Sequence, residues 1–133
     1  MSNLNFSISE LIHSDTAILH KINNMPDINS LDNLLNLIFY VLQPLRSRLN
    51  KPIVITSGYR SKALNRLVKG SETSQHIKGM AADIKVPGMT VQELIDFIKA
   101  TNIEYDQLIN EYNQWVHISF NKNNNRNQYL EMK

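Results

Sequence analysis

The sequence predicts an α+β domain in which helices pack against a small, mainly antiparallel sheet. The first observation is a leucine-rich segment, 30–49, whose apolar side chains recur at helical spacing. The second is a set of short β-branched segments that follow it and alternate with two further helical segments. The third is a pair of strand-like segments, 105–111 and 115–120, which are close enough along the chain to form a hairpin.

The first half of the chain carries clear helix signals. Short helical turns are expected at 9–12 and 14–17, where serine and aspartate residues can cap the exposed backbone N–H groups. A core helix is expected over 30–49, and Pro44 should bend or divide it because proline removes one helical hydrogen bond. The segment 53–56, Ile-Val-Ile-Thr, is expected to be a short buried strand.

The second half alternates between strands and helices. A short helix is expected over 62–69, closed by Gly70. A strand is expected over 81–86, because a Pro-Gly pair follows a short apolar run. Thr90 and Glu93 have the spacing of a capping box, which predicts the start of an amphipathic helix.

Length and composition indicate one domain. A chain of 133 residues with 42% hydrophobic residues can bury a core without disulfide bonds. We expect the domain to cover 1–120, with 121–133 as a polar, flexible tail rich in Asn and Lys. The chain has no cysteine, which removes thiolate metal ligands, a cysteine nucleophile and disulfide bonds from consideration.

Charge and hydropathy narrow the choice of partners. The 14 basic and 12 acidic residues give a net charge of +2 without any basic run, so we expect no nucleic-acid partner. The N-terminus has no secretory signal and the longest apolar run is too short for a bilayer, so we expect cytoplasmic synthesis and no membrane insertion. We expect a monomer, which something else must deliver if its substrate lies outside the membrane.

Three residues have the donor types of a catalytic zinc site. His76 and Asp83 lie seven positions apart, and His117 lies within an apolar strand where alternation places it on the face of Trp115. Two imidazoles and one carboxylate suit zinc, and three protein ligands leave one position open for water, as in catalytic sites. Structural roles for the two histidines are the alternative, because this spacing also occurs by chance.

Four motifs occur in an order that resembles the M15 family of zinc D-Ala-D-Ala carboxypeptidases and related phage endolysins. They are Ser57-Gly58-Tyr59-Arg60-Ser61, Leu64-Asn65, Ser74-x-His76-x-x-Gly79-x-Ala81-x-Asp83 and Trp115-Val116-His117. The small phage and prophage branch is the most similar, and the resemblance covers roughly residues 4–120. It implies the fold shared by hedgehog signalling domains and D-Ala-D-Ala peptidases.

The resemblance also implies roles for individual residues. It implies His76, Asp83 and His117 as Zn²⁺ ligands. His13 and His20 are expected to be surface or structural residues, because a lone histidine is more often one of these than a metal ligand.

It implies that Arg60 faces the substrate, where a guanidinium can neutralise a carboxylate or the oxyanion of a tetrahedral intermediate. A salt bridge that shapes the loop is the alternative for Arg60. Ser74 is expected to bind substrate or orient His76, or instead to cap a turn. Tyr59 and Trp115 are expected to line the pocket or to belong to the core.

The general base is the point at which this chain departs from the family pattern. Many relatives have Glu three residues before the last histidine, but here that position is Gln114, which cannot accept a proton. Glu111 is the nearest carboxylate, and a hairpin loop with an odd number of residues would pair it with Trp115 on the face of His117. An even-numbered loop would point it away. Asp106 is the weaker alternative.

The implied activity is zinc-dependent amide hydrolysis in peptidoglycan stem peptides, next to D-amino acids. The sequence leaves open whether the chain is a carboxypeptidase or an L,D- or D,D-endopeptidase. One alternative keeps the fold but not the reaction, as a zinc-stabilised wall-binding module, and Gln114 favours it. The other is a structural component of a phage particle.

Overall fold

The computed structural model describes residues 4–133. Its helical elements are α1 (Ile8–Ile12), α2 (Asp15–Leu19), α3 (Ile28–Leu37), the π-helical η1 (Ile38–Leu42), α4 (Gln43–Leu49), α5 (Lys62–Leu67), the 3₁₀ turn η2 (Gln75–Lys78) and α6 (Val91–Ala100). Its strands are β1 (Val54–Ser57), β2 (Ala81–Lys85), β3 (Gln107–Glu111), β4 (Trp115–Ser119) and β5 (Gln128–Met132). The predicted α+β class is confirmed.

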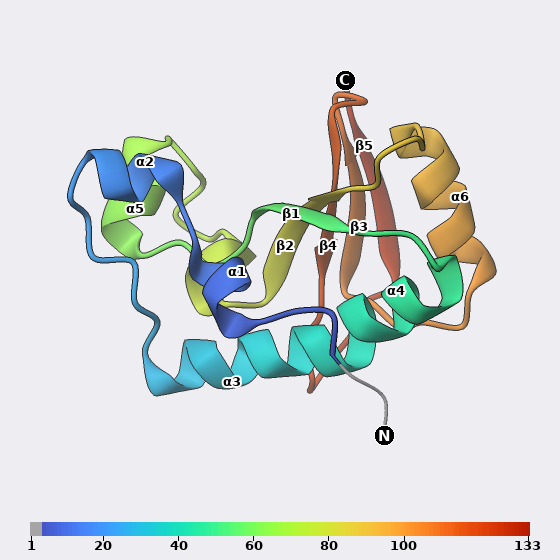
Figure 1. Cartoon of the computed structure of the whole chain (residues 1–133), viewed down its shortest axis with the longest axis horizontal. Coiled ribbons are helices and arrows are strands. Elements are labelled where there is room, and N and C mark those ends of the chain that lie inside the picture. Colours follow the sequence, from blue (N-terminus) through green and yellow to red (C-terminus); the bar gives the residue numbers. More distant parts are fainter. Residues whose placement is uncertain (1–3) are drawn as a thin grey trace.

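The strands of the described chain form one sheet in the order β1-β2-β4-β3-β5 (Figure 1). Strand β2 is antiparallel to β1 and β4, and β4 is antiparallel to β3. Only the pairing of β5 with β3 is parallel among these strands. The sheet is therefore mainly antiparallel, as the sequence predicts.

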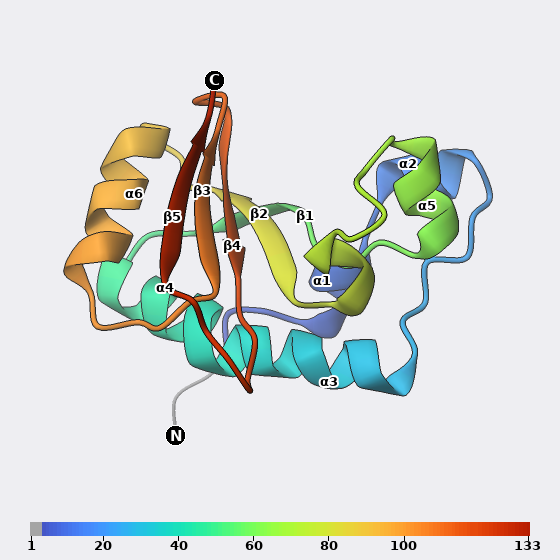
Figure 2. The same cartoon turned by 180° about the vertical axis from the view of Figure 1, so that it is seen from behind.

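The helices α3, α4 and α6 cover one face of the sheet (Figure 2). Leu34 and Leu45 of the long helix pack in one core with Ile84 of β2, Ile118 of β4 and Ile95 of α6. Side chains alternate across a strand, so the neighbours of these core residues point to the opposite face. That opposite face is where the candidate functional residues lie.

The long helix expected over 30–49 is continuous through three segments, α3, η1 and α4, and it bends so that α4 runs at an angle to α3 (Figure 1). Pro44 stands in the first turn of α4, immediately after the π-helical segment. Proline has no N–H to donate to the preceding turn, and the helix accommodates this gap by a change of hydrogen-bond register. The predicted capping box of α6 is present, since Thr90 and Glu93 exchange hydrogen bonds of 3.0 and 2.8 Å.

Two local predictions are wrong in detail. The strand predicted as buried, β1, is an edge strand, and Val54 is 45% exposed because β1 has a strand neighbour on one side only. Helix α5 ends at Leu67, and the left-handed residue after it is Lys69, with φ of 59°, in place of Gly70. Gly70 is needed because a Cβ at this position would lie 2.1 Å from Asn65 Oδ1.

The prediction of a flexible tail over 121–133 is wrong for its second half. Gln128–Met132 forms β5, which pairs in register with β3 from Gln107↔Gln128 to Glu111↔Met132. Without β5, the outer edge of β3 would expose unpaired backbone groups, so the pairing satisfies them. The Asn-rich composition concealed this strand, because its stability comes from a partner some 20 residues earlier in the chain.

Within residues 4–133, no helix combines the length and the apolar character needed to cross a bilayer.

Candidate active site

Asp83 on β2 and His117 on β4 lie opposite each other on neighbouring strands. They are direct partners in the antiparallel pairing of β2 with β4. Paired residues share a face of the sheet, and the side chains next to His117, those of Val116 and Ile118, belong to the core on the other face. The alternation predicted for this strand is therefore confirmed.

His76 reaches the same place from the 3₁₀ turn η2. Ser74 caps this turn, because its Oγ accepts a hydrogen bond of 3.2 Å from the His76 N–H. Gly79 ends the turn with φ of 73°, and a Cβ there would lie 2.3 Å from the carbonyl oxygen of Ser30 in α3. The turn can therefore pack closely against α3, and the His76 residue is only 2% exposed.

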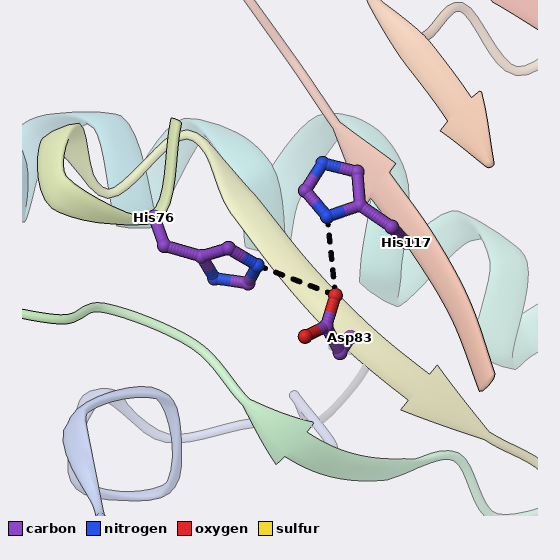
Figure 3. Close-up of side chains that lie close together, drawn as sticks. All are labelled: His76, Asp83 and His117. Carbon is purple, nitrogen blue, oxygen red and sulfur yellow. Dashed lines mark hydrogen bonds and ion pairs between the residues drawn. The ribbon is translucent and has the colours of Figure 1, made fainter. Parts of the chain in front are cut away.

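The three side chains converge on one point (Figure 3). Asp83 Oδ1 lies 3.3 Å from His76 Nε2 and 3.1 Å from His117 Nδ1. One ligand atom from each residue lies within 4.8 Å of the others, and all three residues are buried. The predicted trio thus forms a group that could hold a metal ion.

The hydrogen bond of the second His76 nitrogen shows that the donor set fits a cation. His76 Nδ1 lies 2.7 Å from the carbonyl oxygen of Gly58, which can only accept, so Nδ1 carries the proton. In the neutral ring, Nε2 then has a free lone pair and faces the Asp83 carboxylate, which is also an acceptor. A cation between these two acceptors would stabilise the arrangement. A backbone carbonyl that orients a histidine ligand through its other nitrogen, as the Gly58 carbonyl orients His76, is typical of metal sites.

The carboxylate of Asp83 is held in its charged form. Burial by itself would raise its pKa, but His117 and His76, in their protonated forms, donate hydrogen bonds and add positive charge, which outweigh burial and hold the pKa well below its usual value. A cation bound between neutral rings would favour the carboxylate in the same way. A deprotonated carboxylate is the form that binds a metal ion.

Glu111 lies beside this group. The β3–β4 loop has three residues, and Glu111 is the direct partner of Trp115. This odd-numbered loop is the case expected to place Glu111 on the site face, and its Oε1 lies 3.9 Å from His117 Nδ1. Burial and the charge of Asp83 raise the pKa of Glu111, while His117 and Trp115 oppose that rise. The geometry required of Glu111 is confirmed, and its role as base stays a prediction.

Arg60 contributes an uncompensated positive charge. Its backbone N–H donates to the His76 carbonyl at 3.0 Å, which ties the Arg60 loop to η2. Within the described chain no carboxylate lies within salt-bridge distance of its guanidinium, and its buried Nε has no hydrogen-bond partner. Burial lowers the pKa of Arg60, and the charges of Asp83 and Glu111 act in the opposite direction. The structure shows no loop-shaping salt bridge of the kind considered for Arg60.

All eight predicted site residues line one cleft of about 1310 Å³. They are Tyr59, Arg60, Ser74, His76, Asp83, Glu111, Trp115 and His117. Tyr59 lines the cleft and, at 8% exposed, also belongs to the core, so it has both of the positions predicted for it. Trp115 is more exposed and forms part of the wall. Ser74 has the capping role that was one of its two predicted roles.

Four other candidate residues do not belong to the group of His76, Asp83 and His117. Gln114 is exposed and does not line the cleft. Asp106 is 1% exposed and is held by Arg126, with Nε–Oδ1 and Nη2–Oδ2 distances of 2.7 and 2.9 Å. His13 Nε2 lies 2.9 Å from Asp15 Oδ1, and both exposed residues line the cleft. His20 is exposed and lies outside the lining.

Two further cleft residues, Gln75 and Arg126, were not among the predicted site residues. Arg126 lies in the segment predicted to be flexible, and Gln75 had no assigned role beside His76. Both hold Asp106, since Gln75 Nε2 donates to its Oδ2 at 2.7 Å. The adjacency of Gln75 to His76 was the one available signal. None existed for Arg126, because its contact depends on the position of β5.

Comparison with known proteins identifies the family of this chain. No protein with a curated description matches the chain. The family described as Peptidase M15 matches residues 4–119, which include every candidate ligand, Arg60 and Glu111. The match ends before Arg126 and β5. The chain belongs to the peptidase M15 family.

Proposed function

We propose that this chain is a zinc-dependent peptidase that cuts an amide bond next to a D-amino acid in peptidoglycan stem peptides. One observation carries the proposal: His76, Asp83 and His117 converge on one point, and the Glu111 carboxylate lies 3.9 Å from His117. A metal-binding group and an adjacent carboxylate are the two components that metal-assisted hydrolysis needs.

Zinc is the metal that this donor set favours. Two ring nitrogens and one carboxylate oxygen form a borderline ligand set, and the chain offers no thiolate. Three protein ligands leave a coordination position for the reaction, whereas structural zinc sites use four. Bound zinc would supply Lewis-acid polarisation of the scissile carbonyl and a lowered pKa for the attacking water.

Glu111 is suited to transfer the proton. A general base works best when its pKa lies closer to the working pH than that of an ordinary carboxylate, and burial moves the Glu111 pKa in this direction. The same carboxylate would accept a proton from the attacking water and return it to the leaving amine nitrogen. This assignment makes a carboxylate at position 114 unnecessary.

The cleft suits an anionic peptide. Its volume of about 1310 Å³ exceeds the roughly 300–1,000 Å³ of small-molecule pockets, so a peptide segment fits. Arg60 offers an unpaired guanidinium for a substrate carboxylate or for the oxyanion that develops at the cut carbonyl. Trp115 and Tyr59 would provide apolar walls, and Ser74 a polar edge beside His76. Stem peptides, which carry carboxylates and small side chains, match this lining.

The proposal is tested by mass spectrometry of fragments released from purified peptidoglycan. The protein is assayed as prepared, after chelation, and after zinc is returned. New termini within the stem peptide that disappear on chelation and return with zinc would support the proposal. Loss of a terminal residue would identify a carboxypeptidase, and internal cuts would identify an endopeptidase. No release from protein that holds one zinc ion would overturn the proposal and favour a wall-binding or phage structural module.

A further inference from the structure

The Arg60 guanidinium lies near a second unpaired polar group, which is an acceptor and could take a hydrogen bond from it. Asn65, in α5, is 2% exposed, and its Oδ1 is buried without a hydrogen-bond partner. The Arg60 Nε is likewise buried without a partner. One group is an acceptor and the other is a donor, and buried polar groups that lack partners are rare in folded proteins. An unpaired donor and an unpaired acceptor so close together indicate a hydrogen bond that forms when ligand binds.

The orientation of the Asn65 amide is fixed by the turn that follows α5. Its Nδ2 donates to the Ser71 carbonyl at 3.0 Å, so the amide nitrogen is occupied and Oδ1 points the other way. The backbone supports the same arrangement, because the Gly70 N–H donates to the Asn65 carbonyl at 2.8 Å. The acceptor is therefore held in place by contacts that do not involve Arg60.

Gly70 provides the space in which the two groups meet. A Cβ on residue 70 would lie 2.1 Å from Asn65 Oδ1 and 2.8 Å from Arg60 Nη1. Both atoms thus lie against the same point above the Gly70 backbone. A side chain at this position would push the amide, the guanidinium or both away. The amide cannot move without loss of its bond to Ser71.

We propose that Asn65 and Gly70 are positioning residues that hold the Arg60 guanidinium in the cleft. Asn65 Oδ1 is the acceptor that the guanidinium would meet when substrate draws it into place, a bond not yet formed in this structure, and Gly70 leaves room for Oδ1 and Arg60 Nη1 to approach each other. The inference rests on the proposed function in one respect, namely that Arg60 contacts substrate. Arg60 keeps its full charge, since an amide holds it where a carboxylate would neutralise it.

A double-mutant cycle tests the proposal on the zinc-loaded protein. We expect Asn65→Leu, which is close in shape, to lower kcat/KM for a stem peptide by about 10- to 100-fold, as loss of a hydrogen bond to a charged group does. In an Arg60→Ala background, the same change should lower kcat/KM no further. Equal losses in both backgrounds would show that Asn65 acts independently of Arg60, and would overturn the proposal.

Gly70→Ala is the second variant, in case Asn65→Leu folds poorly, and the same cycle with Arg60→Ala applies. Ala63→Gly is the matched control, because Ala63 is exposed on the same helix and does not line the cleft. It weakens α5 by the cost of glycine in a helix without touching Arg60. Zinc content should be unchanged in all these variants.

A second measurement does not depend on activity. In the wild type the buried Arg60 Nε–H should give an NMR signal that exchanges slowly with solvent. Asn65→Leu and Gly70→Ala should both speed this exchange, and Ala63→Gly should not. Unchanged exchange in both site variants would overturn the positioning role. If the wild type hydrolyses no peptide, the proposed function fails, and the exchange experiment still decides whether Asn65 and Gly70 hold Arg60.

Discussion

Glu111 lies directly opposite Trp115 in the β3–β4 hairpin, and this pairing places the Glu111 carboxylate beside His117. The pairing follows from a loop of three residues, in which Tyr112 and Asn113 both adopt positive φ values. A shift of one residue in the register would move Glu111 to the core face of the sheet. The loop geometry therefore determines which carboxylate is available to the candidate site.

Glu111→Gln should retain zinc and lose turnover. The amide keeps the size of the side chain but cannot accept a proton, so we expect kcat to fall by about 10²- to 10⁴-fold. Zinc content measured by mass spectrometry should not change. Gln114→Ala is the control, and it should keep most of the zinc and most of the activity because Gln114 lies outside the cleft. A fully active Glu111→Gln variant would place the base elsewhere.

Replacement of either buried histidine should remove the metal. His76→Ala or His117→Ala eliminates one of three candidate ligands, so we expect zinc binding to be abolished. Zinc at 100 times its Kd should stabilise the wild type by about 2.7 kcal/mol, and thermal unfolding with and without zinc should show no such gain in the variants. His13→Ala should behave as wild type. Unchanged zinc content in both site variants would disprove the ligand assignment.

The Asp106–Arg126 pair should make stability depend on acid pH. Hydrogen bonds from Arg126 lower the pKa of Asp106 from 3.8 to about 2. Because the folded-state pKa is the lower one, this stabilisation is fully present above about pH 4 and is lost as pH falls through about 2. Urea unfolding at a series of pH values should show that Asp106→Asn reduces the acid-dependent part of the free energy of unfolding. Asp32→Asn, an exposed change in α3, is the control and should not reduce it. Parallel pH profiles for wild type and Asp106→Asn would contradict this.

Removal of β5 should lower stability and turnover while the three candidate metal ligands stay in place. Deletion of 128–133 exposes the outer edge of β3, and the Tyr112 N–H loses the Met132 carbonyl that it contacts at 2.9 Å. We expect a lower unfolding temperature, a lower kcat and retained zinc, because Glu111 is on β3 and the ligands are not. The measurements are calorimetry, turnover and metal content. Wild-type kcat after the deletion would show that β5 does not support Glu111.

Several features of this protein could be predicted from local sequence. The meeting of His76, Asp83 and His117 was predicted from residue types, spacing and the family resemblance, and the capping box from two residues three positions apart. For Glu111 the sequence reduced the question to whether the hairpin loop is odd- or even-numbered, and the structure answered it with a loop of three residues. These predictions hold because each depends on chain geometry over a few residues, which distant contacts rarely change.

Tertiary structure alone decided the remaining features. Strand β5 exists because the edge of β3 is available to it, and its Asn-rich approach gave no periodic signal. Strand β1 is exposed because it stands at the other edge of the sheet. The contact of Gly70 with Arg60 and Asn65 depends on the path of the turn after α5. The sequence itself determined the chemical groups and their local geometry, whereas sheet order and the meeting of distant segments depend on long-range packing that no short window of sequence encodes.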